Sequence, residues 1–410
     1  MIYLDNGATS FPKPPEVIAA MEHACRVLGV NPGRSGYDLC REAGRVIEET
    51  RALLARFFGG PDPERLVFAA NATDALNLAI FGLLGPGDHA ISSALDHNST
   101  LRPLWHLAEQ GVQVEHVGFD ERGYIDPDDV IRRFRPNTRA VVLNHGSNVI
   151  GTVQPLAPIG RACRARGIHL VVDVSQTAGV APVNLDDLGA DVLCFTGHKS
   201  LLGPMGTGGM YVREGVDLRH TRAGGSGVNS IERRHLDAYP FRMEYGTPNL
   251  PGIAGLRAGV TWLRSRSREA IAAHELRLWR LLRDGLREIP GIVLYCQDSD
   301  ADRIPVLAFN IEGLEAAHTG ALLDADHDVA ARTGLHCAPR VHEALGTDKL
   351  GGAVRFVPGP FSNEDEMLSA LDAVRRIAAG RFRSRSRRSP RPAAPRTSSP
   401  ESLSRRGQVA

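Results

Sequence analysis

The chain has 410 residues, 42% of them hydrophobic, and its formal net charge is +1. This length predicts one large domain and a smaller one; no apolar run approaches the ~20 residues that span a membrane, and the first residues lack the basic and apolar regions of a secretory signal. Six scattered cysteines without a C-x-x-C pair indicate neither a disulfide framework nor a zinc site, so we expect a soluble cytoplasmic protein with no metal.

Short apolar strands alternate with helical patterns between about residues 65 and 213. The predicted strands are 65–70, 89–94, 112–118, 139–144, 169–174, 191–196 and 208–212, and the predicted helices are 73–84, 100–109, 127–134 and 155–166. This alternation predicts an α/β fold in which helices cover both faces of a large, mostly parallel sheet. Binding chemistry in such sheets lies at the carboxyl ends of the strands.

The pattern changes after a predicted helix at about 249–263. A long helix, strands, a helix and a further strand follow, and a last helix is expected at 363–379. We therefore predict a large α/β domain at 13–262 and a smaller α+β domain at 263–380, which packs with residues 1–12.

The last segment, 381–410, holds nine Arg and one Glu, and it is rich in Ser and Pro. With almost nothing apolar to bury, it is predicted to be a disordered tail. A basic tail can contact nucleic acid, but a solvated appendage without a partner is the simpler interpretation. The rest of the chain is not basic, so we expect no nucleic-acid partner for it.

Lysine occurs only at positions 13, 199 and 349, although lysine and arginine together number 48. Arginine keeps its proton, whereas a desolvated lysine can lose it and form a Schiff base. Lys13 lies beside prolines and Lys349 lies in a Gly-rich turn, so both are expected on the surface. Lys199 follows a predicted buried strand and is therefore the candidate catalytic lysine.

Asp173 lies near the end of the predicted strand at 169–174. A carboxylate that leaves an apolar strand needs a cationic or hydrogen-bonding partner. The pyridinium nitrogen of pyridoxal phosphate is such a partner, and an Asp there keeps the ring protonated as an electron sink. An Asp that caps a nearby helix is the simpler alternative. Asp173 and Lys199, one helix and one strand apart, together favour the cofactor.

Two further strand ends carry candidate ligands. Thr73 follows a predicted strand at a helix start, where backbone N–H groups bind phosphate, although an ordinary N-cap fits equally well. His97 also follows a predicted strand. A lone His is usually structural, but at this place it can stack on a flat ring.

Cys337 differs from the other cysteines because its loop is basic. Arg332, His336 and Arg340 surround it in the sequence, and a positive, partly exposed setting favours the reactive thiolate. Three other cysteines fall in helical or strand patterns and are expected to be buried packing residues: Cys25, Cys163 and Cys194. Cys337 is therefore the candidate reactive cysteine.

Eight short motifs lie in order along residues 1–378, and with them the sequence resembles the class V aminotransferase-like group, specifically cysteine desulfurases and selenocysteine lyases. Each motif has low specificity, but their order and spacing are typical of this family. The motifs are Tyr3–Thr9, Asn31–Gly36, Asn71–Asn77, Ser147–Thr152, Asp173–Gln176, Thr196–Lys199, Gly246–Asn249 and Arg332–Pro339. The resemblance implies a pyridoxal-phosphate-dependent transferase of fold type I.

The resemblance also implies how the cofactor is held. Lys199 would form the Schiff base with it, Asp173 would pair with the pyridinium nitrogen, Gln176 would contact the phenolic oxygen, and His97 would stack on the ring and shuttle protons. Four residues would hold the phosphate, the last of them from the neighbouring subunit of a homodimer: Thr73, Thr196, His198 and Thr247.

For the substrate, the resemblance implies that Asn148 and Arg355 bind the carboxylate, a task for which Arg is suited. Cys337 would attack the sulfur of cysteine and carry it as a persulfide, from which a sulfur-acceptor protein can take it. Departures from the family pattern include Ala72, which supplies no hydroxyl to the phosphate, and the Arg-rich tail, which has no counterpart.

Three classes of function are compatible with these residues. The first is a cysteine desulfurase that converts L-cysteine to L-alanine. The second is another reaction of the same cofactor, such as selenocysteine cleavage, amino transfer, racemisation or a lyase reaction on another amino acid, which would not require Cys337. The third is a non-catalytic protein that keeps the fold, against which the set Lys199, Asp173, His97 and Gln176 argues, since fold alone does not demand these side chains.

Overall fold

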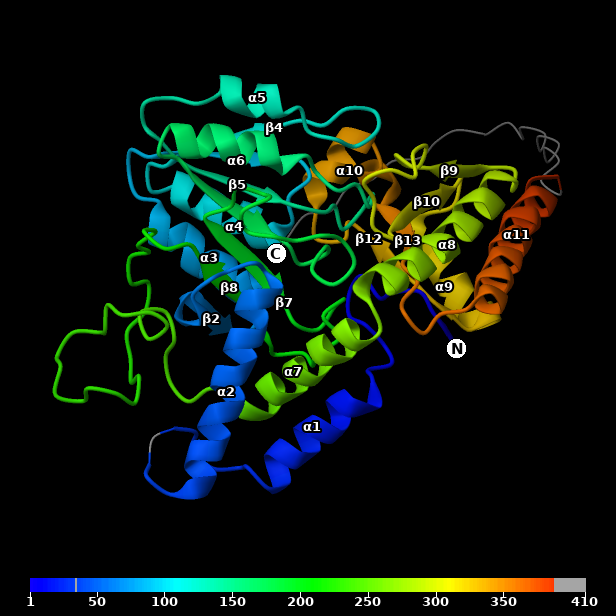
Figure 1. The fold of residues 1–410 in the computed structure, drawn as a ribbon. Helices are drawn as coiled ribbons and strands as arrows, with labels where there is room; N and C mark the ends of the chain where they lie inside the picture. Colours follow the sequence, from blue (N-terminus) through cyan, green and yellow to red (C-terminus); the bar gives the residue numbers. More distant parts are fainter. Residues whose placement is uncertain (34, 387–410) are drawn as a thin grey trace, which may run out of the picture.

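A seven-stranded sheet forms the centre of the larger part of the molecule (Figure 1). The computed structural model describes residues 1–33 and 35–386. Along the sheet the strand order is β2-β8-β7-β6-β5-β3-β4, and β8 is antiparallel to both of its neighbours while the other pairs are parallel. The strands are β2 (Leu66–Ala69), β3 (His89–Ser93), β4 (Gln113–Val117), β5 (Thr138–Asn144), β6 (His169–Asp173), β7 (Val192–Thr196) and β8 (Gly208–Val212).

Helices cover both faces of this sheet because its strands are apolar on both sides. In β6, Leu170 and Val172 belong to the core on one face, whereas Val171 belongs to the core on the other, as the alternation of strand side chains requires. The first face is covered by α2 (Asp38–Phe57), α5 (Pro127–Arg132), α6 (Leu156–Ala165) and α7 (Leu250–Ser265). The second face is covered by α3 (Ala72–Leu83) and α4 (Asn98–Ala108).

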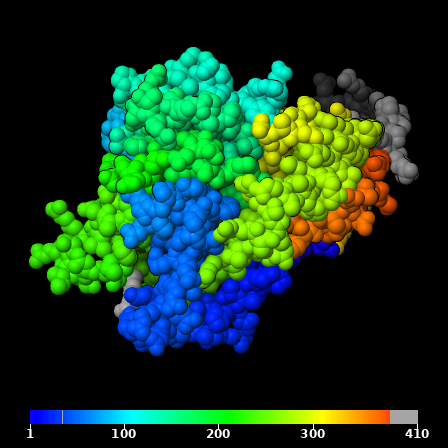
Figure 2. Space-filling model, in the orientation of Figure 1, coloured from blue at the N-terminus to red at the C-terminus, as the bar shows by residue number. Residues whose placement is uncertain are grey.

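Other elements lie outside the sheet and the helices that cover its two faces. Helix α1 (Pro15–Arg26) packs along α7. The segment between β8 and α7 projects from the body as a long loop, drawn in green in both views (Figures 1 and 2). The short 3-10 helix η1 (Pro63–Arg65) leads from α2 into β2.

A smaller, antiparallel sheet of order β12-β13-β10-β9 lies beside the large one. Its strands are β9 (Ile292–Leu294), β10 (Leu307–Ile311), β12 (Arg332–Gly334) and β13 (Ala353–Phe356). The surrounding helices are α8 (Arg268–Arg287), α9 (Ala316–His327), α10 (Pro339–Leu345), η2 (Asp348–Leu350) and α11 (Glu364–Ser386). The start of the chain joins this part, because β1 (Ile2–Tyr3) pairs with β11 (Val329–Ala330) and Leu4 is buried in the core of the smaller part.

The fold class predicted from the sequence is confirmed, and the predicted strands and helices of the large sheet are present with ends that differ by only a few residues. Two details differ. Cys25 lies in α1 as expected but is exposed rather than buried. Helix α11 continues to Ser386, beyond the predicted start of the tail at 381, since arginine is a good helix former.

The remaining predictions on organisation stand as predictions. Residues 387–410 of the predicted tail lie outside the described part of the chain. The division into domains at about residue 263 is compatible with the two sheets. The core of the large sheet, however, also includes Ala338, Val341 and Ala353 from the later part of the chain. Among the residues that the structure describes, no helix has both the length and the apolar character needed to cross a membrane.

Candidate active site

A cavity of about 260 Å³ lies where the parallel strands β5, β6 and β7 end and the loop after β12 meets them. All but one of the site residues predicted from the sequence line it: Lys199, Cys337, His97, Asp173, Gln176, Thr73, Thr196, His198, Asn148 and Arg355. Thr247 lies instead in a separate groove of about 810 Å³, so a single chain does not bring Thr247 to the cavity.

Lys199 follows β7 and carries its amine into the cavity. Burial, helped by the charges of Arg355 and Arg332, lowers the pKa of Lys199 to about 8, although the carboxylate of Asp173 opposes the shift. The amine is therefore closer to its reactive neutral form near neutral pH than an exposed lysine is. This is the environment that a Schiff-base lysine requires.

Lys13 is not the free surface residue expected from the sequence. Its Nζ atom donates to the hydroxyl of Ser10 at 2.7 Å and to the carbonyl oxygen of His198 at 2.8 Å. Ser10 Oγ in turn donates to the carbonyl of Lys199 at 2.9 Å. Lys13 therefore helps to fix the backbone that carries Lys199, and its partial burial lowers its pKa to about 8.

Asp173 ends β6 with its side chain buried, at 7% exposure. One carboxylate oxygen, Oδ1, accepts hydrogen bonds from the backbone N–H of Ser175 at 2.9 Å and from the Ser175 hydroxyl. These bonds fix the orientation of the carboxylate in the cavity. The next lining residue, Gln176, donates from Nε2 to the carbonyl of Gly7 at 3.0 Å, so the N-terminal segment closes this side of the site.

His97 is the N-cap residue of α4, which sets the position of its ring. Burial and the charges of Lys199, Arg332, Arg355 and Arg102 lower the pKa of His97 to about 3, so the ring is neutral. The backbone N–H of Ser99 donates to Nδ1 at 3.1 Å, and Ser99 Oγ lies 2.8 Å from the same nitrogen. Because a backbone N–H can only donate, Nδ1 is the acceptor and the ring proton is on Nε2.

Several buried polar atoms around the cavity have no hydrogen-bond partner among the described residues: Thr196 Oγ1, His198 Nδ1, Asn148 Oδ1 and Arg355 Nε. Buried polar atoms are rarely left in this state, so a polar ligand would satisfy them. Thr73 lies in the first turn of α3, where the helix dipole and backbone N–H groups attract an anion. These features fit a ligand that carries a phosphate group.

Cys337 follows β12 on a short loop held in an unusual conformation. His336 and Cys337 both have positive φ values, +48° and +57°, which are strained for residues with a Cβ atom. Two hydrogen bonds fix the two successive carbonyls: Asn148 Nδ2 donates to His336 O at 2.7 Å, and the Asn98 N–H donates to Cys337 O at 2.7 Å. The loop is therefore anchored to the large sheet on both sides of the thiol.

Fewer of the residues near Cys337 in the sequence carry a positive charge than the sequence predicts. Arg332 contacts the sulfur, with Nη2 lying 3.5 Å from Sγ. His336 is buried and donates from Nε2 to Ala353 O at 3.0 Å, and burial, more than the nearby charge of Arg355, lowers its pKa well below the ordinary value. His336 is therefore neutral, and Arg332 supplies the positive charge beside the thiol.

Arg355 and Asn148, the residues predicted to bind a substrate carboxylate, contact each other. Arg355 is 1% exposed, and its Nη1 donates to the backbone oxygen of Asn148 at 2.8 Å while Nη2 donates to Asp5 Oδ1 at 2.8 Å. Asp5 thus compensates the buried guanidinium. Asn148 lines the cavity and uses its Nδ2 group on the loop of Cys337, while its Oδ1 has no partner in the described part of the chain.

Two serines at the site were not found from the sequence. Ser175 holds Asp173, and Ser99 links the ring of His97 to the hydroxyl of Thr73, whose Oγ1 lies 2.7 Å from Ser99 Oγ. Serine is common at helix starts and turns, so neither position stands out without coordinates. Their closeness in sequence to His97 and Asp173 is the one signal that could have identified them.

Known proteins resemble this chain over most of its length. The sequence profile of the family described as Aminotransferase class-V matches residues 2–367. The probable cysteine desulfurase of Methanothermobacter thermautotrophicus is 31% identical over 383 residues, covering 92% of this chain and 94% of the relative. The cysteine desulfurase of Klebsiella pneumoniae is 31% identical over 390 residues, with coverage of 92% and 94%.

Solved structures give the same result. The apo structure of the cysteine desulfurase from Thermococcus onnurineus superposes with a TM-score of 0.85 at 32% identity, covering 92% of this chain and 95% of the other. The cysteine desulfurase CsdA from Escherichia coli superposes with a TM-score of 0.81 at 27% identity, with coverage of 92% and 94%. By its sequence profile, its relatives and its fold, this chain belongs to the class-V aminotransferase family, among the members named cysteine desulfurases.

Proposed function

We propose that this chain is a pyridoxal-phosphate-dependent cysteine desulfurase, which converts L-cysteine to L-alanine and retains the sulfur on Cys337 as a persulfide. The observation that carries this proposal is that Cys337 and Lys199 line the same cavity and that the guanidinium of Arg332 lies 3.5 Å from the Cys337 sulfur. A thiol in this place has a use in sulfur transfer, whereas other reactions of the cofactor do not need it.

The lining residues would hold the cofactor by its separate groups. Lys199 would bind it covalently through Nζ, and the buried carboxylate of Asp173 would pair with the ring nitrogen. The neutral ring of His97 would lie against the cofactor ring, and Gln176 would contact its phenolic oxygen. Three residues would bind the phosphate: Thr73, Thr196 and His198. When bound, pyridoxal phosphate supplies an electron sink for negative charge that develops on the substrate.

The other residues would act on the amino acid. Arg355 and Asn148 would bind the substrate carboxylate, Asn148 through the second hydrogen of its Nδ2 group, since its Oδ1 can only accept. The thiolate of Cys337, stabilised by Arg332, would attack the sulfur of cysteine; the new S–S bond forms as the carbon–sulfur bond breaks. The carbon then needs a proton, and the groups that hold protons at the cavity are Lys199 at Nζ and His97 at Nε2.

Three further points belong to the same proposal. The chain would act as a homodimer in which Thr247 of one subunit completes the phosphate site of the other, since Thr247 lies in the 810 Å³ groove away from the cavity of its own chain. The chain would be organised as a large domain at 13–262 and a small one at 263–380. The protein would work in the cytoplasm and pass its sulfur to an acceptor protein.

One experiment tests the reaction directly. The purified protein is incubated with pyridoxal phosphate and L-cysteine, or in a parallel assay L-selenocysteine, and alanine, sulfide or selenide and Cys337 persulfide are quantified together. Equal amounts of alanine and released or bound sulfur are expected. Amino-group transfer to the cofactor without sulfur release, or turnover of selenocysteine alone, would replace the desulfurase by one of the other reactions.

A further inference from the structure

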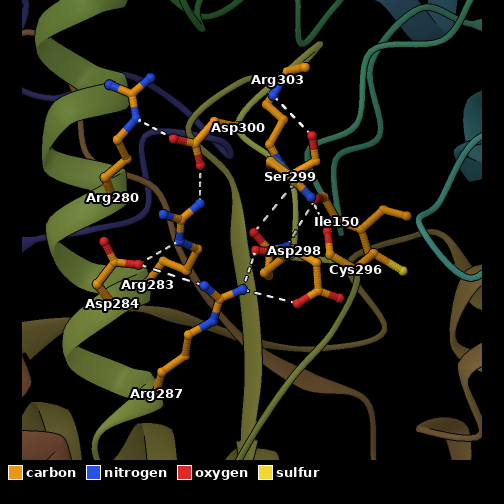
Figure 3. A network of polar contacts seen from close by, with 12 residues as sticks. Ile150, Arg280, Arg283, Asp284, Arg287, Cys296, Asp298, Ser299, Asp300 and Arg303 are labelled. Carbon is orange, nitrogen blue, oxygen red and sulfur yellow. Dashed lines mark hydrogen bonds and ion pairs between the residues drawn. The ribbon is translucent and has the colours of Figure 1, made fainter.

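A network of arginines joins α8 to the segment 296–303 (Figure 3). Arg280 and Arg283 of α8 both reach the carboxylate of Asp300, and Arg287 donates to Asp298 at 3.0 Å. Each of these contacts is an ion pair. Their carboxylate partners, Asp298 and Asp300, are exposed to solvent, which weakens such pairs, so this part of the network needs no functional explanation.

Arg303 is 7% exposed, as Arg283 is, but its hydrogen bonds run to neutral oxygens rather than to carboxylates. Its Nε donates to Ser299 O at 2.7 Å, its Nη2 to Cys296 O, and its Nη1 to Ile150 O at 3.1 Å. The carbonyl of Ile150 also accepts a bond from Gln297 Nε2 at 3.0 Å. Two side chains from 296–303 therefore hold one backbone oxygen that lies far away in the sequence.

Ile150 belongs to the turn 147–151, which also has hydrogen bonds between its own residues. The Ser147 hydroxyl accepts from Ile150 N at 3.3 Å, and Gly151 N donates to Ser147 O at 3.1 Å. On the same side as Arg303, Ile304 N donates to Gly151 O at 2.9 Å. The turn is thus attached to the segment that carries Arg303 and cannot shift independently of it.

The other side of this turn carries Asn148, which is 5% exposed. Its Nδ2 donates to His336 O at 2.7 Å, and its own carbonyl accepts from Arg355 Nη1 at 2.8 Å. The His336 carbonyl immediately precedes Cys337, and both residues have positive φ values. A strained conformation of this kind persists only while its surroundings hold it, so the Asn148 bond is part of what keeps the thiol in place.

We propose that Arg303 is a positioning residue for Cys337. By holding the carbonyl of Ile150 it fixes the turn 147–151, and Asn148 on that turn fixes the backbone before the thiol. The inference rests on the proposed function only in naming Cys337 as the sulfur acceptor. The physical coupling between residue 303 and the loop exists whichever reaction the cavity performs.

Arg283 offers a matched control for Arg303. The two guanidiniums lie over the ring of Trp279, with Cζ at 4.6 Å from its centroid for Arg283 and 5.1 Å for Arg303. Arg283 is also 7% exposed and hydrogen-bonded within the same network. Its contacts go to Asp284 and Asp300 and not to the turn 147–151. A loss of stability common to both substitutions can therefore be separated from an effect on the loop.

The test compares Arg303→Met, Arg303→Lys and Arg283→Met with the native holoenzyme. Hydrogen exchange is followed at 147–151, at 334–338 and at the Asn98 amide, which donates to Cys337 O. We expect faster exchange at all three places in both Arg303 variants, because methionine removes the donors and lysine lacks the fork that spans several oxygens. Arg283→Met should lower the melting temperature and leave these amides as they are in the native protein.

Turnover gives a second readout. The kcat for cysteine should fall about tenfold or more in the Arg303 variants while the cofactor absorbance is unchanged, because small displacements of a reacting group are costly. Exchange at 334–338 no faster than in Arg283→Met would overturn the inference, and Arg303→Lys decides the matter if Arg303→Met does not fold. A native protein that does not release sulfur would refute the desulfurase proposal, and the exchange comparison would still decide the coupling.

Discussion

The guanidinium of Arg332 and the thiol of Cys337 face each other across the end of β12, with Nη2 at 3.5 Å from Sγ. A single positive charge at this distance stabilises a thiolate. His336, next to the cysteine in sequence, is neutral because it is buried. The positive charges near Cys337 therefore come from Arg332, which contacts the sulfur, and from Arg355 and Lys199 in the same cavity, and not from His336.

Replacement of Arg332 by Met should slow the alkylation of Cys337 by iodoacetamide at pH 7, since it removes the guanidinium that contacts the Cys337 sulfur at 3.5 Å. Mass spectrometry measures the rate at Cys337, and the exposed Cys25 in the same sample is the internal reference. Arg340→Met is the control and should alkylate like the native protein. Equal rates in both variants would remove Arg332 from this role.

Replacement of Cys337 by Ser should leave cofactor binding intact and reduce desulfuration of cysteine at least a hundredfold, because a neutral hydroxyl does not accept the sulfur. Alanine release measures this loss, and Cys25→Ser serves as the control. Selenocysteine is expected to retain part of its turnover because its carbon–selenium bond is weaker. Unchanged turnover of cysteine, with no persulfide on the native loop, would favour a different reaction of the cofactor.

Replacement of Lys199 by Ala should abolish the borohydride-reducible link between protein and cofactor. Burial lowers the pKa of both Lys199 and Lys13 to about 8, but of these two only Lys199 lines the cavity. Peptide mapping after reduction locates the link. Lys349→Ala changes an exposed lysine and should leave the link unchanged; a link found at Lys13 or Lys349 would contradict the assignment.

Glu275 of α8 is a buried carboxyl group behind the site, at 4% exposure. It borders a small cavity of about 20 Å³, and its Oε2 has no hydrogen-bond partner in the part of the chain that the structure describes. Such a cavity has room for about one water molecule. Burial raises the pKa of Glu275 to about 8, so the folded protein keeps a proton that the unfolded chain releases near pH 4.5.

Because the folded state binds more protons between these two values, the free energy of unfolding should fall as the pH rises from about 4.5 to about 8. Each unit of the pKa difference contributes roughly 1.4 kcal/mol. Glu275→Gln should remove this part of the pH dependence, as measured by melting temperatures at pH 5 and pH 8. The exposed Glu288→Gln is the control, and an equal loss of stability on raising the pH in all three proteins would show that Glu275 is ionised in the fold.

Much of the fold follows from local patterns in the sequence. The strands at 169–173 and 192–196 are short apolar runs, and their alternation with helices leaves few arrangements besides a parallel sheet. The same topology brings Asp173, Lys199 and His97 to one edge, because parallel strands end together. The basic neighbours of Cys337 in the sequence are what indicate a reactive cysteine at this position.

What the sequence did not reveal depends on contacts between distant segments. Cys25 occupies a helix, but which side of α1 faces solvent depends on the packing against α7. Lys13 gains its partners from the loop at 198, and Arg303 gains its partner from the turn at 150. None of these pairings leaves a periodic signal in the chain, so local patterns are not informative about them.

The attachment of the N-terminal segment has a consequence for the order of folding. Residues 2–3 pair with residues 329–330, Asp5 pairs with Arg355, and Ser10 holds the backbone of Lys199. At a synthesis rate of about 5–20 residues per second, the first residues wait roughly 20 to 70 seconds for the partner strand to leave the ribosome. The cavity is therefore completed only after residues 329–355 have been synthesised, and a nascent chain cannot engage its cofactor fully before then.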